Sequence, residues 1–291
     1  MAAVRLPADP WSIGIFAGRD PFHLVAPAHI PNPVLMREDI FDVVAAFIAD
    51  PFLLYYDGVW HLFFEVLNQV AQKGEIGWAS SDDTIAWTYR GIVLREPYHL
   101  SYPYVFEHGG DVFMVPETLG AASVRLYRGE PFPTRWVYQR DLIPASLADP
   151  SMLFFQGKWW LFACPRPNHH DALSLYWANA LTGPWIAHPL NPLIHDDQRN
   201  ARPAGRVLVD QGRAYRLAQD CVARYGHQVR AFEITILTDQ QYLEREHPNS
   251  PILTGSGAGW NGKAMHHVDA HQVRDGLWIA AVDGLFLPPG C

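Results

Sequence analysis

Cysteine is scarce in this chain, which has only Cys164, Cys221 and Cys291 and no CxxC pair. Neither a disulfide scaffold nor a thiolate metal site is therefore predicted. Long hydrophobic runs are also missing: no segment is apolar enough to span a membrane, and the amino terminus lacks the core of a signal peptide. We expect a cytoplasmic protein with no membrane partner, and the alternative is a chain trimmed of its signal.

Positive charge is also in short supply. The 22 Lys and Arg residues are outnumbered by 30 Asp and Glu residues, which gives a formal net charge of −8, and no basic cluster occurs. Nucleic acids and anionic membrane surfaces attract proteins through clustered positive charge. Neither is an expected partner.

Aromatic and turn-forming residues, in contrast, are abundant. The chain is 49% hydrophobic and 13% aromatic, with 22 Gly and 24 Pro. This mixture suits a large core built from short strands joined by turns. No long amphipathic helix is evident, since only residues 39–47 have the pattern of a helical turn or two. The composition predicts an all-β protein.

A hairpin pattern recurs five times along the chain. Residues 49–65 contain an apolar run, an Asp-Gly turn and a second aromatic-rich run. Related copies lie near residues 101–117, 148–163, 201–220 and 267–284. The period of roughly 45 to 65 residues is typical of propeller blades. We predict one domain over residues 1–291, a five-bladed β-propeller with four-stranded antiparallel blades around a central axial pocket. The alternative is a β-sandwich with similar hairpins.

Each copy has a polar residue at its first or second position, and a proline follows this residue in the first four copies. The innermost strands of a propeller run beside the axis, so matching positions converge there. These anchors are Asp50, Tyr102, Asp149, Arg202 and His267. Burying such groups without partners is costly, so the ring predicts a pocket for a polar, sugar-sized ligand. Singly, an Asp before proline can also cap a turn, and Arg202 can serve as a counter-ion.

The second strand of each hairpin ends in a partly polar layer that includes Glu65, Glu117 and Asp220. Glu117 follows a proline at the rim of an aromatic-lined pocket, where a carboxyl group can have a raised pKa and act as an acid. Glycosidic cleavage requires such an acid and a second carboxyl group. We predict Asp50 as its partner and Asp149 as the residue that tunes them. The expected sugar-binding residues are Tyr102, Arg202, Asp220, His267 and Glu65.

Three histidines, His266, His267 and His271, lie close together in the sequence. A zinc site is not expected there, because alternate strand residues point to opposite faces and no cysteine or spaced carboxylate completes a tetrahedral set. We predict neither a metal nor a cofactor.

Several motifs together resemble known families. The hairpins ADPF…GVWHLFFE and ADPS…GKWWLF, with GEIGWASSD and the PET that follows HLSYPYVF, resemble the five-bladed propellers of the arabinanase, xylosidase and fructosidase clans of glycoside hydrolases. With WSIGIF, ARPAGR and AQDC, nearly the full chain resembles the amino-terminal domain of plant glucosamine inositolphosphorylceramide transferase and related bacterial domains sometimes joined to formyltransferases.

The hydrolase resemblance implies a carboxylate base or nucleophile at Asp50, a general acid at Glu117 and a pKa-tuning carboxylate at Asp149. The chain departs from the hydrolase pattern at its second anchor, which is Tyr102, so catalysis does not follow from the resemblance alone.

Three functions fit these observations. The first is an enzyme that cleaves or transfers a glycosyl group of a carbohydrate or glycoconjugate, with a furanosyl group as one candidate. The second is a non-catalytic carbohydrate-binding propeller that uses the same groups only for hydrogen bonds. Carboxyl groups across an open cleft favour the enzyme, and salt-bridged carboxylates favour the binding domain. The third, an interaction propeller that uses its rim, requires an exposed apolar patch.

Overall fold

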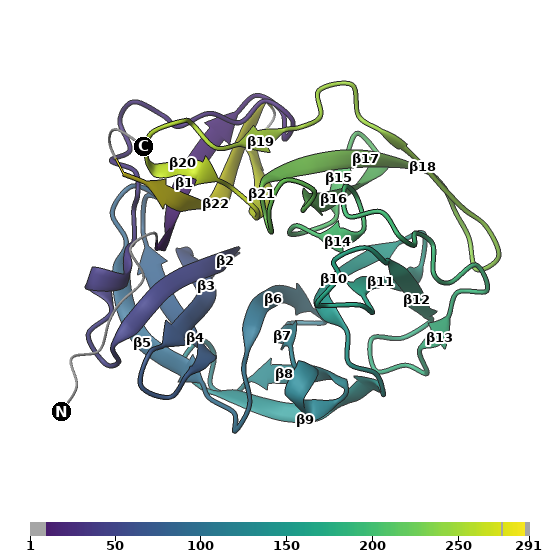
Figure 1. The fold of residues 1–291 in the computed structure, drawn as a ribbon. Helices are drawn as coiled ribbons and strands as arrows, with labels where there is room; N and C mark the ends of the chain where they lie inside the picture. Colours follow the sequence, from purple (N-terminus) through teal and green to yellow (C-terminus); the bar gives the residue numbers. More distant parts are fainter. Residues whose placement is uncertain (1–9, 275, 289–291) are drawn as a thin grey trace.

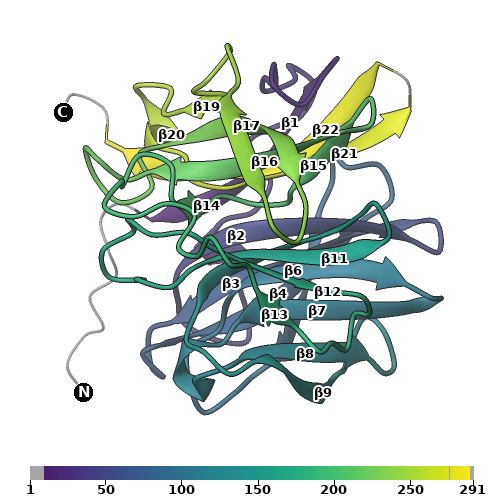
Figure 2. The same ribbon diagram turned by 90° about the vertical axis from the view of Figure 1, so that its right-hand side faces the viewer.

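The computed structural model describes residues 10–274 and 276–288, which form five antiparallel sheets arranged as a wheel (Figure 1). This arrangement confirms the predicted five-bladed β-propeller. Figure 2 views the wheel from its rim, with strands β16 (Arg213–Asp220) and β17 (Gln228–Leu237) above and strands β8 (Val124–Gly129) and β9 (Trp136–Ile143) below. Among the described residues, no helix has the length and apolar character needed to cross a membrane.

The first three blades follow the chain and each has four strands in sequence order. Blade 1 contains β2 (Ala45–Tyr56), β3 (Val59–Asn68), β4 (Lys73–Ser81) and β5 (Thr88–Leu94). Blade 2 contains β6 (Ser101–His108), β7 (Asp111–Glu117), β8 (Val124–Gly129) and β9 (Trp136–Ile143). Blade 3 contains β10 (Ala148–Phe155), β11 (Lys158–Cys164), β12 (Ser174–Ala178) and β13 (Ile186–Ala187).

The last two blades are less regular, and blade 5 joins the two ends of the chain. Strand β1 pairs with β22 over its whole length, which closes the wheel. Blade 4 contains β14 (Arg202–Pro203), β15 (Leu208–Asp210), β16 (Arg213–Asp220), β17 (Gln228–Leu237), β18 (Tyr242–Glu246) and β19 (Leu253–Thr254). Blade 5 contains β1 (Trp11–Gly18), β20 (Gly259–Ala264), β21 (Val268–Arg274) and β22 (Leu277–Leu287).

Two-residue turns set the register of the inner hairpins. Both turn residues have positive φ at Asp57-Gly58, Gly109-Gly110, Gln156-Gly157 and Gln211-Gly212. Turns of this kind match the right-handed twist of the paired strands and favour glycine at the second position. These short sequences therefore explain why the hairpins form where the repeat predicts them.

Aromatic residues fill the spaces between blades. Phe63 of blade 1 packs edge-on against Trp136 of blade 2, with ring centroids 5.3 Å apart, and Phe106 of blade 2 packs against Trp159 of blade 3 at 5.4 Å. Burying one such side chain contributes roughly 1.5–3 kcal/mol. These contacts hold the blades at fixed angles, which in turn fixes where the inner strands meet.

Part of the axis is filled by a buried ion pair. Arg206 donates from Nε to Oδ1 of Asp269 at 2.7 Å and from Nη2 to the carbonyl oxygen of Val105 at 2.9 Å. Its guanidinium also lies 4.6 Å from the centre of the Tyr104 ring. A blade 4 residue thus contacts blades 2 and 5 across the axis.

Candidate functional site

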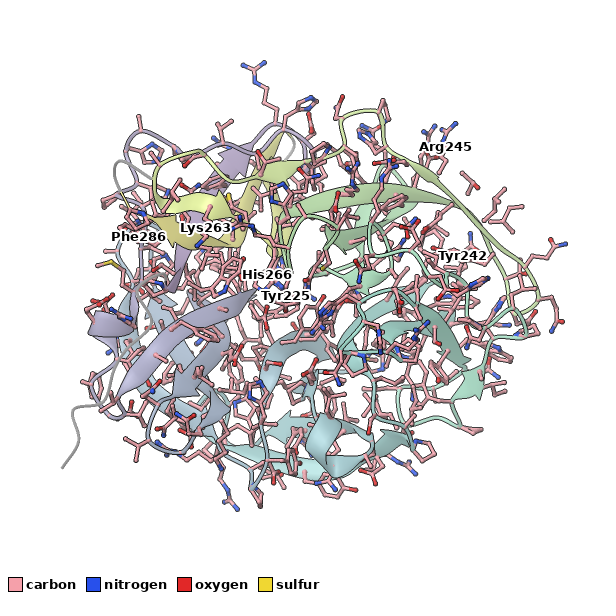
Figure 3. All side chains as sticks on the ribbon, viewed as in Figure 1. Tyr225, Tyr242, Arg245, Lys263, His266 and Phe286 are labelled. Atoms are coloured by element: carbon pink, nitrogen blue, oxygen red, sulfur yellow. The ribbon has the colours of Figure 1, made fainter. Side chains whose placement is uncertain are left out.

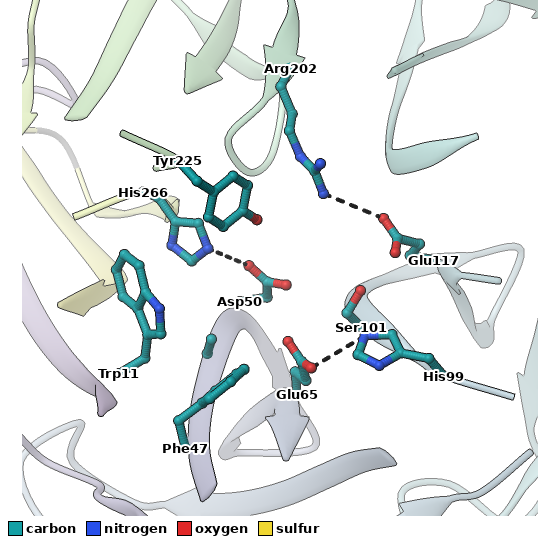
Figure 4. Close-up of a pocket in the computed structure, with 11 residues that line it drawn as sticks. Trp11, Phe47, Asp50, Glu65, His99, Ser101, Glu117, Arg202, Tyr225 and His266 are labelled. Atoms are coloured by element: carbon teal, nitrogen blue, oxygen red, sulfur yellow. Dashed lines mark ion pairs between the residues drawn. The ribbon is translucent and has the colours of Figure 1, made fainter. Parts of the chain in front are cut away.

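A cavity of about 200 Å³ lies where the inner strands converge (Figure 4). Its volume is below the roughly 300–1,000 Å³ of pockets that hold drug-sized ligands, so it fits a small ligand such as one sugar ring. Tyr225, which is 41% exposed, and His99, whose side chain is 45% exposed, connect it to solvent. The charged and aromatic residues that line it are Asp50, Glu65, Glu117, His99, Arg202, His266, Trp11, Phe47 and Tyr225.

Three anchor residues share an unusual backbone conformation. Asp50, Tyr102 and Asp149 have φ values of 53°, 50° and 53°, and each lies at a break in the register of its inner hairpin. A non-glycine residue at positive φ in a β-bulge is strained, and such bulges re-aim side chains next to functional sites. The repeat therefore directs side chains inward by the same local distortion in three blades.

Asp50 is held by blade 5. Its backbone N–H donates to Oδ2 of Asp283 at 3.0 Å, and its own Oδ1 lies 3.5 Å from Nε2 of His266. Burial raises the pKa of Asp50 to about 7, while the charge of His266 opposes this rise. Near neutral pH the carboxyl group can therefore exist in either form.

Glu117 lies across the cavity, at the end of β7. Its Oε2 accepts a hydrogen bond from the backbone N–H of Asp149 at 3.1 Å and lies 3.7 Å from Nη2 of Arg202. Burial, and next the charge of Asp149, raise the pKa of Glu117 to about 8. At pH 7 this side chain is mostly protonated, as a general acid requires.

Asp149, the third predicted carboxylate, is locked in a salt bridge. Oδ2 accepts from Nε of Arg202 at 2.6 Å and from Nε2 of Gln219 at 3.0 Å, and Oδ1 accepts from Nη2 of Arg202 at 3.3 Å. Asp149 is not among the residues that line the cavity. Its side chain fixes the guanidinium that faces Glu117, and its backbone N–H bonds to Glu117 directly.

Glu65 presents an incompletely bonded oxygen. Its Oε1 is buried and has no hydrogen-bond partner among the described residues, although Nε2 of His99 lies 3.3 Å away. Nδ1 of His99 accepts from the backbone N–H of Gly74 at 2.9 Å, so a neutral ring carries its proton on Nε2. Burial, followed by repulsion from Asp50, raises the pKa of Glu65 well above its usual value. A hydroxyl or ammonium group of a ligand would satisfy Glu65.

Three expected sugar-binding residues, Tyr102, Asp220 and His267, do not line the cavity. The hydroxyl group of Tyr102 lies 2.7 Å from Oγ of Ser151 and 3.0 Å from the carbonyl oxygen of Gly205. Oδ2 of Asp220 accepts from its neighbours Gln228 and Arg230, each at 2.9 Å.

The third of these residues, His267, is fully buried between Phe52 and Tyr102, and burial lowers its pKa to about 4. The cavity receives the neighbouring His266 instead. The fifth copy lacks the proline that follows the anchor in the other four. The sequence therefore did not determine whether His266 or His267 occupies the anchor position.

His266 is held by contacts on several sides (Figure 4). Nδ1 lies 2.8 Å from Oδ1 of Asp283, and its ring stacks on Trp11 with centroids 4.1 Å apart. Tyr225 packs edge-on at 5.4 Å, and Figure 3 places both labelled residues near the centre of the wheel. Burial alone would lower the pKa of His266, but the charge and hydrogen bond of Asp283, together with the charges of Asp50 and Asp149, outweigh burial and the pKa is raised.

Ligand atoms of Asp50, His266 and Asp283 lie within 4.8 Å of one another, which is close enough to test as a metal centre. However, Oδ1 of Asp283 already accepts from the backbone N–H groups of His266 and His267 and from the His266 ring, while Oδ2 accepts from Asp50 N–H. Few lone pairs remain for an ion. The trio therefore fits a hydrogen-bonded carboxylate–histidine pair beside Asp50 better than it fits a metal centre.

Solved structures with the same fold include several glycoside hydrolases. A putative glycoside hydrolase from Bacteroides ovatus aligns with a TM-score of 0.65 and 10% identity over 92% of this chain and 95% of its own. RS223-Beta-xylosidase gives a TM-score of 0.61 and 15% identity over 78% of this chain and 82% of its own. Zg3597, a family 117 glycoside hydrolase from Zobellia galactanivorans, gives a TM-score of 0.54 and 13% identity over 84% of this chain and 86% of its own. At such identities the likeness shows the fold alone.

Sequence comparison identifies the family. Glucosamine inositolphosphorylceramide transferase 1 from Oryza sativa subsp. japonica is 34% identical over 303 residues, and that from Arabidopsis thaliana is 33% identical over 297. The alignments cover 96% and 94% of this chain but only 40% and 39% of those relatives. The family profile described as glucosamine inositolphosphorylceramide transferase 1, N-terminal, matches residues 7–285. The chain therefore belongs to this family of N-terminal domains.

Proposed function

We propose that this propeller acts on a glycoconjugate and uses Asp50 and Glu117 to cleave or transfer a glycosyl group held in the axial cavity. One observation carries the proposal: two carboxyl groups from different blades line the same small cavity in different environments. Pairs of carboxyl groups with distinct environments perform acid and base roles in glycosyl chemistry.

The two environments assign the roles. Glu117, with its pKa raised by burial to about 8, is protonated at neutral pH and can donate its proton to the leaving-group oxygen. Asp50 lies beside the His266 imidazole, which favours the carboxylate and suits a base or nucleophile. Both groups are buried, so they act where water screens charge weakly.

The chemistry of the lining supports a sugar ligand. The aromatic rings of Trp11 and Phe47 line the cavity, and Glu65 offers an acceptor for a hydroxyl or ammonium group. The names of the plant relatives refer to glucosamine and to inositolphosphorylceramide. We therefore propose a glycoconjugate substrate, with glucosaminides as the first sugars to test and furanosides as the comparison.

A second function, non-catalytic carbohydrate binding, is favoured by a specific observation. Arg202 binds Asp149 through two nitrogens and lies 3.7 Å from Glu117. A guanidinium favours the ionised form of a neighbouring carboxyl group, which reduces the protonated fraction that a general acid needs at neutral pH. In this function the same groups only hold the sugar.

Substitution of the two carboxyl groups separates these functions. Wild type, Asp50→Asn and Glu117→Gln are assayed on aryl pyranosides, furanosides and glucosaminides, and binding of the parent sugars is measured by calorimetry. For an enzyme we expect both variants to lose at least about 100-fold in kcat, with sugar affinity within about tenfold of wild type. Matched controls are Asp57→Asn and Glu107→Gln, which change exposed residues and should leave activity unchanged. Sugar binding by a wild type without turnover would identify a binding domain instead.

A further inference from the structure

His266 lies between two carboxyl groups and takes no part in the acid–base pair proposed above. Nδ1 is 2.8 Å from Oδ1 of Asp283, and Nε2 is 3.5 Å from Oδ1 of Asp50. Both ring nitrogens therefore face carboxyl oxygens. A protonated imidazole can donate to both sides, whereas a neutral ring has only one N–H.

Asp283 fixes this arrangement from β22. It is fully buried, and Oδ1 also accepts from the backbone N–H groups of His266 and His267 at 3.2 and 3.1 Å. Its other oxygen accepts from the backbone N–H of Asp50 at 3.0 Å. One carboxylate thus holds both the imidazole and the strained bulge that presents Asp50, so their relative positions are set together.

Packing fixes the plane of the imidazole ring. Trp11, from β1, stacks on it with an angle of 27° between the ring planes, and Tyr225 approaches it edge-on. Gly226 is so close that an added Cβ would lie 2.6 Å from Cβ of His266. Strand β1 and the segment 221–227 therefore restrict the ring from two directions.

We propose that His266 is a positioning residue: held by Asp283 and Trp11, it favours the ionised form of Asp50 and directs this carboxyl group into the cavity. This inference rests on the proposed role of Asp50 in the proposed function. It adds a residue that the sequence motifs did not assign and explains how a buried carboxylate can serve as a base.

The charges around Asp50 show why His266 matters. Burial is the largest factor that raises the pKa of Asp50, and the charges of Asp149 and Asp283 act in the same direction. The His266 charge opposes them more strongly than that of Arg202, whose guanidinium is already bonded to Asp149. His267 faces the same carboxylate at 3.8 Å. Other titratable groups that face the cavity from neighbouring elements are Glu65, His99, Glu117 and Tyr225.

His267 does not compensate for His266. Burial lowers its pKa to about 4, which leaves it uncharged at neutral pH. Loss of the His266 charge therefore removes the main positive influence on Asp50, and the carboxyl group should hold its proton to higher pH.

The test compares wild type with His266→Gln and with the matched control His29→Gln, which changes an exposed histidine. Protein carrying ¹³C-labelled aspartate is titrated by NMR, with Asp50→Asn used to assign the Asp50 carboxyl signal. In His266→Gln we expect the Asp50 midpoint to rise by about one pH unit, equivalent to a tenfold change in proton affinity. An unmoved midpoint, or the same shift in His29→Gln, would overturn the inference.

A second measurement uses the wild-type protein and therefore does not depend on whether a variant folds. In ¹⁵N NMR of the wild type, both His266 ring nitrogens should carry protons at pH 7, and a neutral imidazole there would contradict the inference. Where a substrate is found, the acid limb of kcat/KM in His266→Gln should shift upward, with about a tenfold loss at pH 6. A shifted Asp50 midpoint without turnover of any glycoside would refute the proposed function but not the role of His266.

Discussion

Asp50 and Asp149 have the same backbone conformation, with φ of 53° in both, yet their side chains have different environments. Asp149 binds Arg202 at 2.6 Å, whereas Asp50 lies 3.5 Å from an imidazole. A bidentate guanidinium holds a carboxylate permanently, and an imidazole can gain or lose its charge near neutral pH. The repeat therefore supplies equivalent positions, and the neighbouring blades decide the chemistry of each.

Glu117 should make the stability of the protein depend on pH. Its pKa is 4.5 in the absence of the fold and about 8 in the folded state, so between these values the folded state binds the additional proton. Stability relative to Glu117→Gln should be highest below about pH 4.5 and should decrease as pH rises through 8. The slope is at most about 1.4 kcal/mol per pH unit.

Urea denaturation of wild type and Glu117→Gln at pH 5, 6.5 and 8 measures this difference. Because both proteins share every other titrating group, subtraction isolates the contribution of Glu117. A difference that stays constant across these pH values would show that Glu117 titrates in the folded state as it does in the unfolded chain.

The sequence revealed the hairpins because their determinants are local. The two-residue turns, such as Asp57-Gly58, can be recognised from their residue types, and the anchors Asp50 and Asp149 precede prolines in a repeated pattern. Four predicted residues meet at one cavity because the blades place matching positions around one axis; they are Asp50, Glu65, Glu117 and Arg202.

Residues outside the repeat were missed for a physical reason. Tyr225 comes from the connection between β16 and β17, His99 from that between β5 and β6, and Trp11 from the strand that closes the wheel. Their positions depend on how connections fold back over the axis, which no period in the sequence encodes. Likewise, nothing in the sequence indicated that the Tyr102 hydroxyl would be bonded by Ser151 and Gly205.

The connection 221–227 should shape the ligand cavity. Gly226 has φ of 63° and lies against His266, whereas Gly212 has φ of 76° and no atom of the described residues within 4 Å of the point where an added Cβ would lie. Both Gly226→Ala and Gly212→Ala introduce backbone strain of about 1–3 kcal/mol. Only Gly226→Ala should also displace His266 and Tyr225 and weaken sugar binding by calorimetry. Equal binding by the two variants would show that this connection does not shape the cavity.

Closure of the wheel links global stability to the site. Strand β1 pairs with β22 along its length, its Ile15 is fully buried opposite Ala281, and its first residue, Trp11, stacks on His266. The same strand therefore completes the core of blade 5 and lines the cavity. Weakening its attachment should affect both.

Truncation of Ile15 tests this link. Ile15→Ala should lower the free energy of unfolding by about 2–5 kcal/mol, because it leaves a cavity in a packed core. Val70→Ala, at a position that is 72% exposed, should change it by no more than about 0.5 kcal/mol. If closure couples all five blades, circular dichroism and tryptophan fluorescence will report one shared transition for Ile15→Ala, shifted to lower denaturant. Two separate transitions would mean that blade 5 opens alone, and the cavity would then lose Trp11 and its hold on His266 before the other four blades unfold.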